Sequence, residues 1–173
     1  MPSVKNEKTN FLDRGEAIRV ARLTPNPDAR AAILIAFYSG MRIAETLRAV
    51  PVDGAWQLMT TKNGDPRYVP IMAKVAVYAR RWPRLIAKIT VQKWARRGMD
   101  AIGRPDASFH TLRHSTATAI LASGESLDMV GDILGHRDRR STQRYAHRQL
   151  SHMATAMGKL GKKSPTTKFQ MIE

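Results

Sequence analysis

The sequence predicts a mainly α-helical domain with one small antiparallel β-hairpin, which places it in the α+β class. Apolar residues recur at helical spacing through most of the chain, between capping residues and glycines. The middle differs, because an Asn63-Gly64 turn lies there between two strand-like segments. The length of 173 residues suits one domain. We expect a flexible lead-in or linker stump at 1–10, the folded domain at 11–157 and a basic tail at 158–173.

Helical signals dominate the first part of the chain. Asn26 followed by Pro27 is a strong start signal, because Asn caps free backbone N–H groups and Pro fits the first helical position. The residues 29–38 are apolar almost all round, as in a buried helix, and Gly40 ends them. We expect three helices here: one after Leu12 with Asp13 as its cap, one from Pro27 to about Tyr38, and one from Arg42 to about Ala49.

The hairpin is predicted by a change in pattern. The segment 55–61 has the character of a strand, and 67–71 has the character of the returning strand. Asn63 and Gly64 suit the tight turn between them. Lys62 therefore stands at the tip of the hairpin.

Helical spacing returns after the hairpin and continues almost to the tail. Thr90 and Ser126 are candidate caps, and Gly124 and Gly135 are candidate helix ends. We expect helices at 72–81, 91–101, 111–123, 126–134 and 138–156.

The overall charge indicates the kind of partner. Lys and Arg number 29 against 14 Asp and Glu, so the net charge is +15 and the pI is about 10.9. Such a basic domain favours a nucleic-acid partner, although an anionic membrane surface or an unusual protein surface would also give this charge. The chain has no cysteine, which excludes disulfide scaffolds and thiolate metal sites. No run approaches the ~20 apolar residues of a membrane span, and no signal peptide is recognisable, so we expect a cytoplasmic protein without membrane contact.

Two segments hold arginines suited to binding a phosphate. Arg42 precedes Glu45 by three residues, so the carboxylate could hold the guanidinium, and the same pair could also be an ordinary exposed ion pair. His110 and Arg113 are also three apart, near a predicted helix start, and would project to one side. Alternatively, His110 is a helix cap and Arg113 an ordinary surface residue.

Three further residues could take part in chemistry. His136 follows Gly135 at a predicted helix end, where an imidazole is exposed, but a histidine stabilised by the helix dipole would look the same. Tyr145 could be a nucleophile if positive charge surrounds it, whereas a lone tyrosine on a helix is more often a core residue. Lys62 could donate a proton, or could simply be solvated.

Taken together and in order, these segments resemble the signature of the tyrosine recombinases, the family of phage integrases and bacterial chromosome-dimer resolvases. The family pattern has an Arg in Gly-x-Arg-x-x-Glu, a Lys on a β-hairpin, a His-x-Leu-Arg-His box, and Leu-Gly-His followed by a Tyr. The resemblance runs from about Leu12 to Tyr145. It implies a tyrosine-recombinase catalytic domain at 11–157 with six catalytic residues: Arg42, Lys62, His110, Arg113, His136 and Tyr145.

The resemblance also implies a role for each residue. Arg42 and Arg113 would clamp the non-bridging oxygens of a scissile phosphodiester, since guanidinium groups donate in pairs. His136 would add a third hydrogen bond. Tyr145 would attack phosphorus, form a 3′-phosphotyrosyl link and free a 5′-hydroxyl.

The remaining two residues would move protons. Lys62 would protonate the leaving oxygen, and His110 would assist proton transfer at the tyrosine. No metal or other cofactor is required in this scheme, because the cationic side chains stabilise the charge.

The expected function is therefore site-specific DNA recombination of the phage-integrase type on double-stranded DNA. We expect a homo-oligomer, a tetramer, on DNA and possibly a monomer alone. Alternatives are a type IB topoisomerase-like nicking and closing enzyme, a catalytically silent or accessory DNA-binding module of the same fold, and a generic basic helical protein bound to RNA.

Two expectations concern the ends of the chain. Relatives carry an upstream helical DNA-clamping domain, so the chain is expected to be an excised catalytic domain rather than a naturally short protein. Met153, Met157 and Leu160 form an apolar face, which would pack either on a neighbouring subunit or within the same chain.

Overall fold

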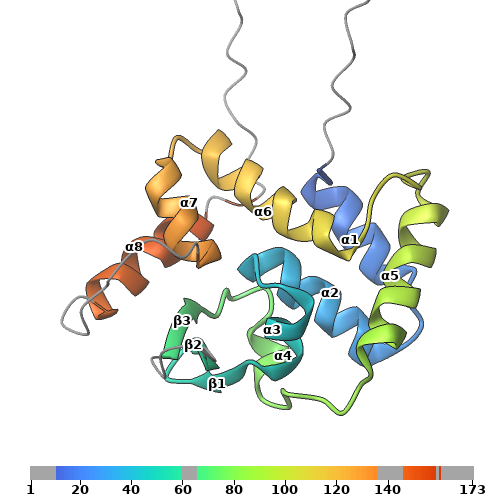
Figure 1. Cartoon of the computed structure of the whole chain (residues 1–173), viewed down its shortest axis with the longest axis horizontal. Helices are drawn as coiled ribbons and strands as arrows, with labels where there is room; N and C mark the ends of the chain where they lie inside the picture. Colours follow the sequence, from blue (N-terminus) through green and yellow to red (C-terminus); the bar gives the residue numbers. More distant parts are fainter. Residues whose placement is uncertain (1–10, 60–65, 136–145, 159, 161–173) are drawn as a thin grey trace, which may run out of the picture.

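The computed structural model describes residues 11–59, 66–135, 146–158 and 160. Within these ranges the fold is mainly helical with one three-stranded antiparallel sheet (Figure 1), which confirms the predicted fold class. The elements follow in the order α1 (Arg14–Arg22), α2 (Pro27–Ser39), α3 (Ile43–Arg48), β1 (Val50–Val52), β2 (Ala55–Met59), β3 (Pro66–Pro70), α4 (Ala76–Ala79), α5 (Lys88–Ala101), α6 (Phe109–Ala122), α7 (Leu127–Leu134) and α8 (Ala146–Gly158).

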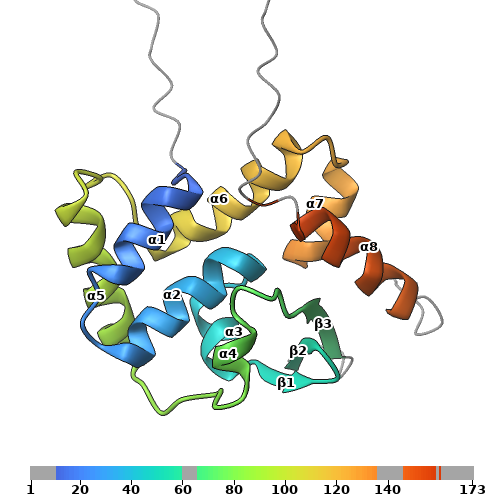
Figure 2. The ribbon, with the colours of Figure 1, turned by 180° about the vertical axis from the view of Figure 1, so that it is seen from behind.

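Helix α2 is the centre of the helical part and contacts α1, α3, α5 and α6. It starts as predicted, because the Asn26 side chain accepts a hydrogen bond from the Ala29 N–H at 2.8 Å and Pro27 opens the helix. Nine of its 13 residues are buried. It ends at Gly40, whose positive φ of 67° turns the chain toward α3. Figure 2 shows α2 from behind, with α1, α5 and α6 beside it.

The sheet has the order β1-β2-β3, and β2 pairs with both neighbours. The predicted hairpin is confirmed as β2 and β3, with Trp56 opposite Val69 and both side chains fully buried. Strand β1 was not predicted, because Pro51 has no N–H for a ladder. Pro51 lies on the edge strand, where that donor is not needed.

Three predicted helix ranges differ from the structure after the hairpin. The predicted helix 72–81 is helical only at α4, because the backbone bonds on either side join residues three apart, such as Val75 N–H to the Met72 carbonyl at 2.9 Å. The predicted cap Thr90 lies inside α5, which starts at Lys88 after Ala87. Helix α6 likewise starts two residues earlier than expected.

The C-terminal part folds back onto the sheet. Ser126 caps α7 as predicted, through a 3.1 Å hydrogen bond from the Met129 N–H. The predicted helix 138–156 is confirmed for its second part by α8, while 138–145 lies outside the described residues. Helix α8 packs against β3.

The apolar face of α8 is covered by its own chain. Met153, Met157 and Leu160 are at most 6% exposed and belong to the main core. Packing within the same chain is therefore the correct alternative for these residues. None of the helices in the described part of the chain has the length and apolar character that crossing a membrane requires.

Candidate functional site

A cluster of charged side chains forms around the carboxylate of Glu45, at the start of α3. The backbone N–H of Arg42 donates to Oε2 of Glu45 at 2.8 Å, and Nη1 of Arg42 donates to Oε1 at 2.9 Å. The predicted Arg42–Glu45 pair is therefore present, as a local contact between residues three apart. The Arg42 side chain is 52% exposed, so its guanidinium can still meet a ligand.

Arg113 reaches the same carboxylate from α6, but it is buried. Its Nη1 donates to the Gly40 carbonyl at 2.8 Å, and its Nη2 donates to the Leu134 carbonyl at 2.8 Å. Its Nη1 also lies 3.8 Å from Oε2 of Glu45. The alternative of an ordinary surface arginine is therefore wrong, because the residue is only 5% exposed.

The electrostatics of Arg113 follow from this packing. Burial is the largest cause that lowers its pKa to about 10, with the positive charge of Arg42 next, Glu45 opposing the shift, and Arg67 adding to it. The guanidinium stays protonated at neutral pH. Two helix ends, at Gly40 and Leu134, supply carbonyl oxygens that compensate its charge.

A third arginine, Arg67 of β3, belongs to the cluster and was not predicted. Its Nη2 lies 3.1 Å from Oε2 of Glu45, and its Nη1 donates to the Ile133 carbonyl. The side chain is 17% exposed, and burial lowers its pKa while Glu45 opposes that shift. No local pattern marks this residue, since its partners are 22 and 66 positions away.

His110 lies in the first turn of α6, next to the arginines. The helix is capped by Ser108, whose N–H donates to the Thr111 hydroxyl at 2.9 Å, so the alternative that His110 is the cap is wrong. Its ring meets that of His114 edge to face, with centroids 4.8 Å apart. Burial lowers the pKa of His110 below 6.5, and the charges of His114, Arg113 and Arg42 lower it further. The imidazole is therefore mostly neutral at pH 7 and able to accept a proton.

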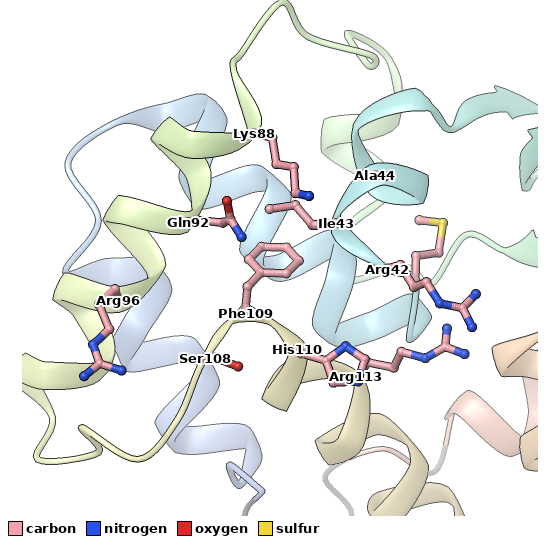
Figure 3. Close-up of a pocket in the computed structure, with 11 residues that line it drawn as sticks. Arg42, Ile43, Ala44, Lys88, Gln92, Arg96, Ser108, Phe109, His110 and Arg113 are labelled. Atoms are coloured by element: carbon pink, nitrogen blue, oxygen red, sulfur yellow. The ribbon is translucent and has the colours of Figure 1, made fainter.

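A cavity of about 470 Å³ opens beside these residues, between α3, α5 and the start of α6. Figure 3 shows the guanidinium groups of Arg42 and Arg113 at one end of it, while Arg96 projects from α5 at the other. The α5 residues that line it are spaced four apart and so share one face of the helix. They are Lys88, Gln92 and Arg96. Sequence reasoning missed this face, although its spacing could have revealed it.

The structure thus brings together three of the six predicted site residues: Arg42, His110 and Arg113. The other three, Lys62, His136 and Tyr145, lie outside the described residues.

Comparison with known proteins identifies similar families and folds. Residues 83–152 match the model of the phage integrase family. The tyrosine recombinase XerC of Rhizobium meliloti is 33% identical over 140 residues, which are 66% of this chain and 44% of that protein. The tyrosine recombinase XerD of Lacticaseibacillus casei is 29% identical over 157 residues, which are 75% of this chain and 54% of that protein.

Solved structures show the same fold. An integrase from mycobacterium phage Brujita superposes with a TM-score of 0.71 over 97% of this chain and 62% of that chain, at 20% identity. Together, the fold and the matches define the catalytic domain of a tyrosine recombinase. Within that class, the family model that the chain matches, over residues 83–152, is that of the phage integrases. It spans about half the length of the curated relatives it matches.

Proposed function

We propose that this domain cuts and rejoins double-stranded DNA at specific sites through a covalent 3′-phosphotyrosyl intermediate. One observation carries the proposal: Arg42, His110 and the buried Arg113 converge at one end of a single cavity. A buried arginine and an exposed one near the same carboxylate form a cationic site suited to a phosphate. The relatives named tyrosine recombinases support the reaction type.

The described residues would bind the scissile phosphodiester. Arg42 and Arg113 would donate to its non-bridging oxygens, on which negative charge grows during attack. Arg113 is held by two backbone carbonyls, so its position is set before the ligand arrives. His110, which is mostly neutral at pH 7, would accept the proton of the attacking phenol.

Three residues outside the described ranges would complete the reaction. The oxygen of Tyr145 would attack phosphorus, forming the phosphotyrosyl bond while the bond from phosphorus to the 5′ oxygen breaks. Lys62 would give that oxygen its proton, leaving a 5′-hydroxyl. His136 would donate a further hydrogen bond to the phosphate. Rejoining is the reverse reaction, so the scheme consumes no nucleotide cofactor.

The DNA backbone would extend past Arg42 and Arg113 along α5. Lys88 and Arg96 lie on the face that lines the cavity, and the chain as a whole carries a net charge of +15. Among the structural neighbours, lambda integrase has been solved as a dimer bound to a core site and as a tetramer bound to a Holliday junction. We propose DNA as the partner here, a homo-oligomer, a tetramer, on that DNA, and action in the cytoplasm. The proposed domain limits stay at 11–157, with 1–10 as lead-in and 158–173 as tail.

The test is covalent capture from a library that requires no knowledge of the target site. The protein is incubated with nicked duplexes whose central sequence is randomised, so that a cut next to the nick releases a short strand and traps the adduct. Denaturation in detergent, recovery of protein-linked DNA and sequencing then reveal the site. Tyr145→Phe, which lacks only the nucleophilic oxygen, is the matched control.

Each outcome separates one alternative. Adducts that share a sequence and vanish in Tyr145→Phe support the proposal. Adducts without shared sequence indicate a nicking and closing activity of the topoisomerase type. Salt-sensitive DNA binding without adducts indicates a DNA-binding module and contradicts the proposed reaction of this domain.

A further inference from the structure

The end of α7 is held by two guanidinium groups. Arg67 donates through Nη1 to the Ile133 carbonyl, and Arg113 donates through Nη2 to the Leu134 carbonyl at 2.8 Å. These carbonyls are among the last of the helix, which have no partner within it. Cations are also favoured at the negative end of a helix dipole. Two successive carbonyls at this end are thus bound by side chains from β3 and α6.

The same two arginines meet again at Glu45. Its Oε2 lies 3.1 Å from Nη2 of Arg67 and 3.8 Å from Nη1 of Arg113, and it accepts the Arg42 N–H at 2.8 Å. Arg67 therefore connects the carboxylate of Glu45, which also holds Arg42, to the end of α7, which Arg113 also binds. A planar guanidinium with several donors can make such a connection, whereas a single ammonium group is far less suited to it.

Gly135 shows how closely Arg67 lies against this helix end. A Cβ atom at Gly135 would lie 2.7 Å from Nε and 2.8 Å from Cζ of Arg67. Only a glycine leaves room for the guanidinium at this distance, and its φ of 68° also favours glycine. The contact fixes the position of the chain where α7 ends.

We propose that Arg67 is a positioning residue for Arg42 and Arg113, the two arginines that would bind the phosphate. Arg67 is not among the described residues that line the cavity, so it acts through Glu45 and the end of α7 rather than on the substrate. It keeps Arg42 and Arg113 in one geometry relative to each other and to α7. This inference rests on the proposed function, because it concerns the rate of that reaction.

The expected effect is on rate and not on DNA affinity. Arg67→Ala frees Glu45 and the α7 end, and a displacement of about 1 Å in a catalytic group costs about 100-fold in rate. Arg67→Lys retains the charge but serves one acceptor at a time, so we expect about a tenfold loss. The equilibrium Kd for DNA stays within about twofold, since Arg67 makes no phosphate contact in this scheme.

Arg104→Ala is the matched control. Arg104 is also largely covered, at 19% exposed, and also joins a carboxylate to a backbone carbonyl, through Glu16 at 3.2 Å and Phe11 at 3.0 Å. It lies in the loop between α5 and α6, is not among the residues that line the cavity, and connects this loop to the start of α1 through Phe11 and Glu16. A general loss of stability would therefore affect both variants alike.

The experiment measures single-turnover adduct formation at saturating protein, DNA affinity and amide hydrogen exchange of residues 131–135. The proposal is supported if Arg67→Ala forms the adduct slowly but binds DNA with normal affinity, while Arg104→Ala forms it at the normal rate. Equal rates in the two variants overturn it while leaving the proposed function intact. If the wild-type protein forms no adduct, the proposed function fails. Hydrogen exchange then tests separately whether Arg67 holds the end of α7. If it does, the exchange rate of residues 131–135 rises about tenfold in Arg67→Ala and not in Arg104→Ala. Unchanged exchange overturns the inference.

Discussion

Gly40 offers a quantitative test of how closely the ends of α2 and α7 pack against each other next to Arg113. It has a φ of 67°, and a Cβ atom there would lie 2.5 Å from Cδ2 of Leu134 and 3.3 Å from Cγ2 of Thr116. Leu134 is 4% exposed and Thr116 is fully buried, so neither side chain has open space to move into. The substitution Gly40→Ala therefore combines backbone strain with overpacking.

Both contributions can be estimated. A left-handed backbone costs an alanine about 1 kcal/mol relative to glycine, and overpacking in a filled core costs about 1–3 kcal/mol. We expect Gly40→Ala to lower the free energy of unfolding by about 2–4 kcal/mol. Gly124→Ala is the matched control, because Gly124 also has a positive φ, 87°, but no atom within 4 Å of its Cβ position. It should lose only about 1 kcal/mol.

The assay is urea denaturation of both variants, followed by far-ultraviolet circular dichroism, with m-values compared to confirm that a single transition is measured. Equal losses in the two variants would refute the close approach of α2 and α7. They would also weaken the assignment of the Gly40 carbonyl as an acceptor for Arg113, since both rest on the same packing.

Two further predictions concern titration and salt. The pKa of His110 in the folded state lies below the unfolded value of 6.5, so protonation favours the unfolded chain and stability falls as the pH drops through 6.5 toward the folded pKa. His114→Gln removes a like charge and should raise the His110 pKa, as followed by NMR titration of the ring; an unchanged midpoint would contradict the contact between the rings. Lys88→Gln should lower the slope of log K against log salt by about 0.9 if Lys88 neutralises one DNA phosphate, whereas an unaltered slope would remove α5 from the DNA path.

Local signals explain most of what the sequence predicted correctly. The caps at Asp13, Asn26 and Ser126 are all confirmed, because each accepts a hydrogen bond from a backbone N–H three residues later. The Arg42–Glu45 pair is local in the same sense. Such interactions depend on spacing along the chain, which the sequence displays directly.

The rest of the site depends on contacts between distant segments. Arg113 binds carbonyls 73 and 21 positions away, and Arg67 binds one 66 positions away. No pattern within a helix or strand specifies these partners. A contact of the same long-range kind lies just after the short α4, where the Trp82 side chain donates to the Thr46 carbonyl of α3 at 2.8 Å. Periodicity alone predicted a longer helix there, since it does not register a tertiary contact.

The shared carboxylate of Glu45 has a consequence for the stability of the domain. Three guanidinium groups surround it, so positive charge is in excess at the junction of α3, α6 and β3. An anion that binds between Arg42 and Arg113 reduces the repulsion among these groups and, because it binds only the folded chain, shifts the folding equilibrium toward the native state. We therefore expect ions such as phosphate or sulfate to stabilise the domain against unfolding. Under the proposed function, the same ions would compete with DNA for these charges.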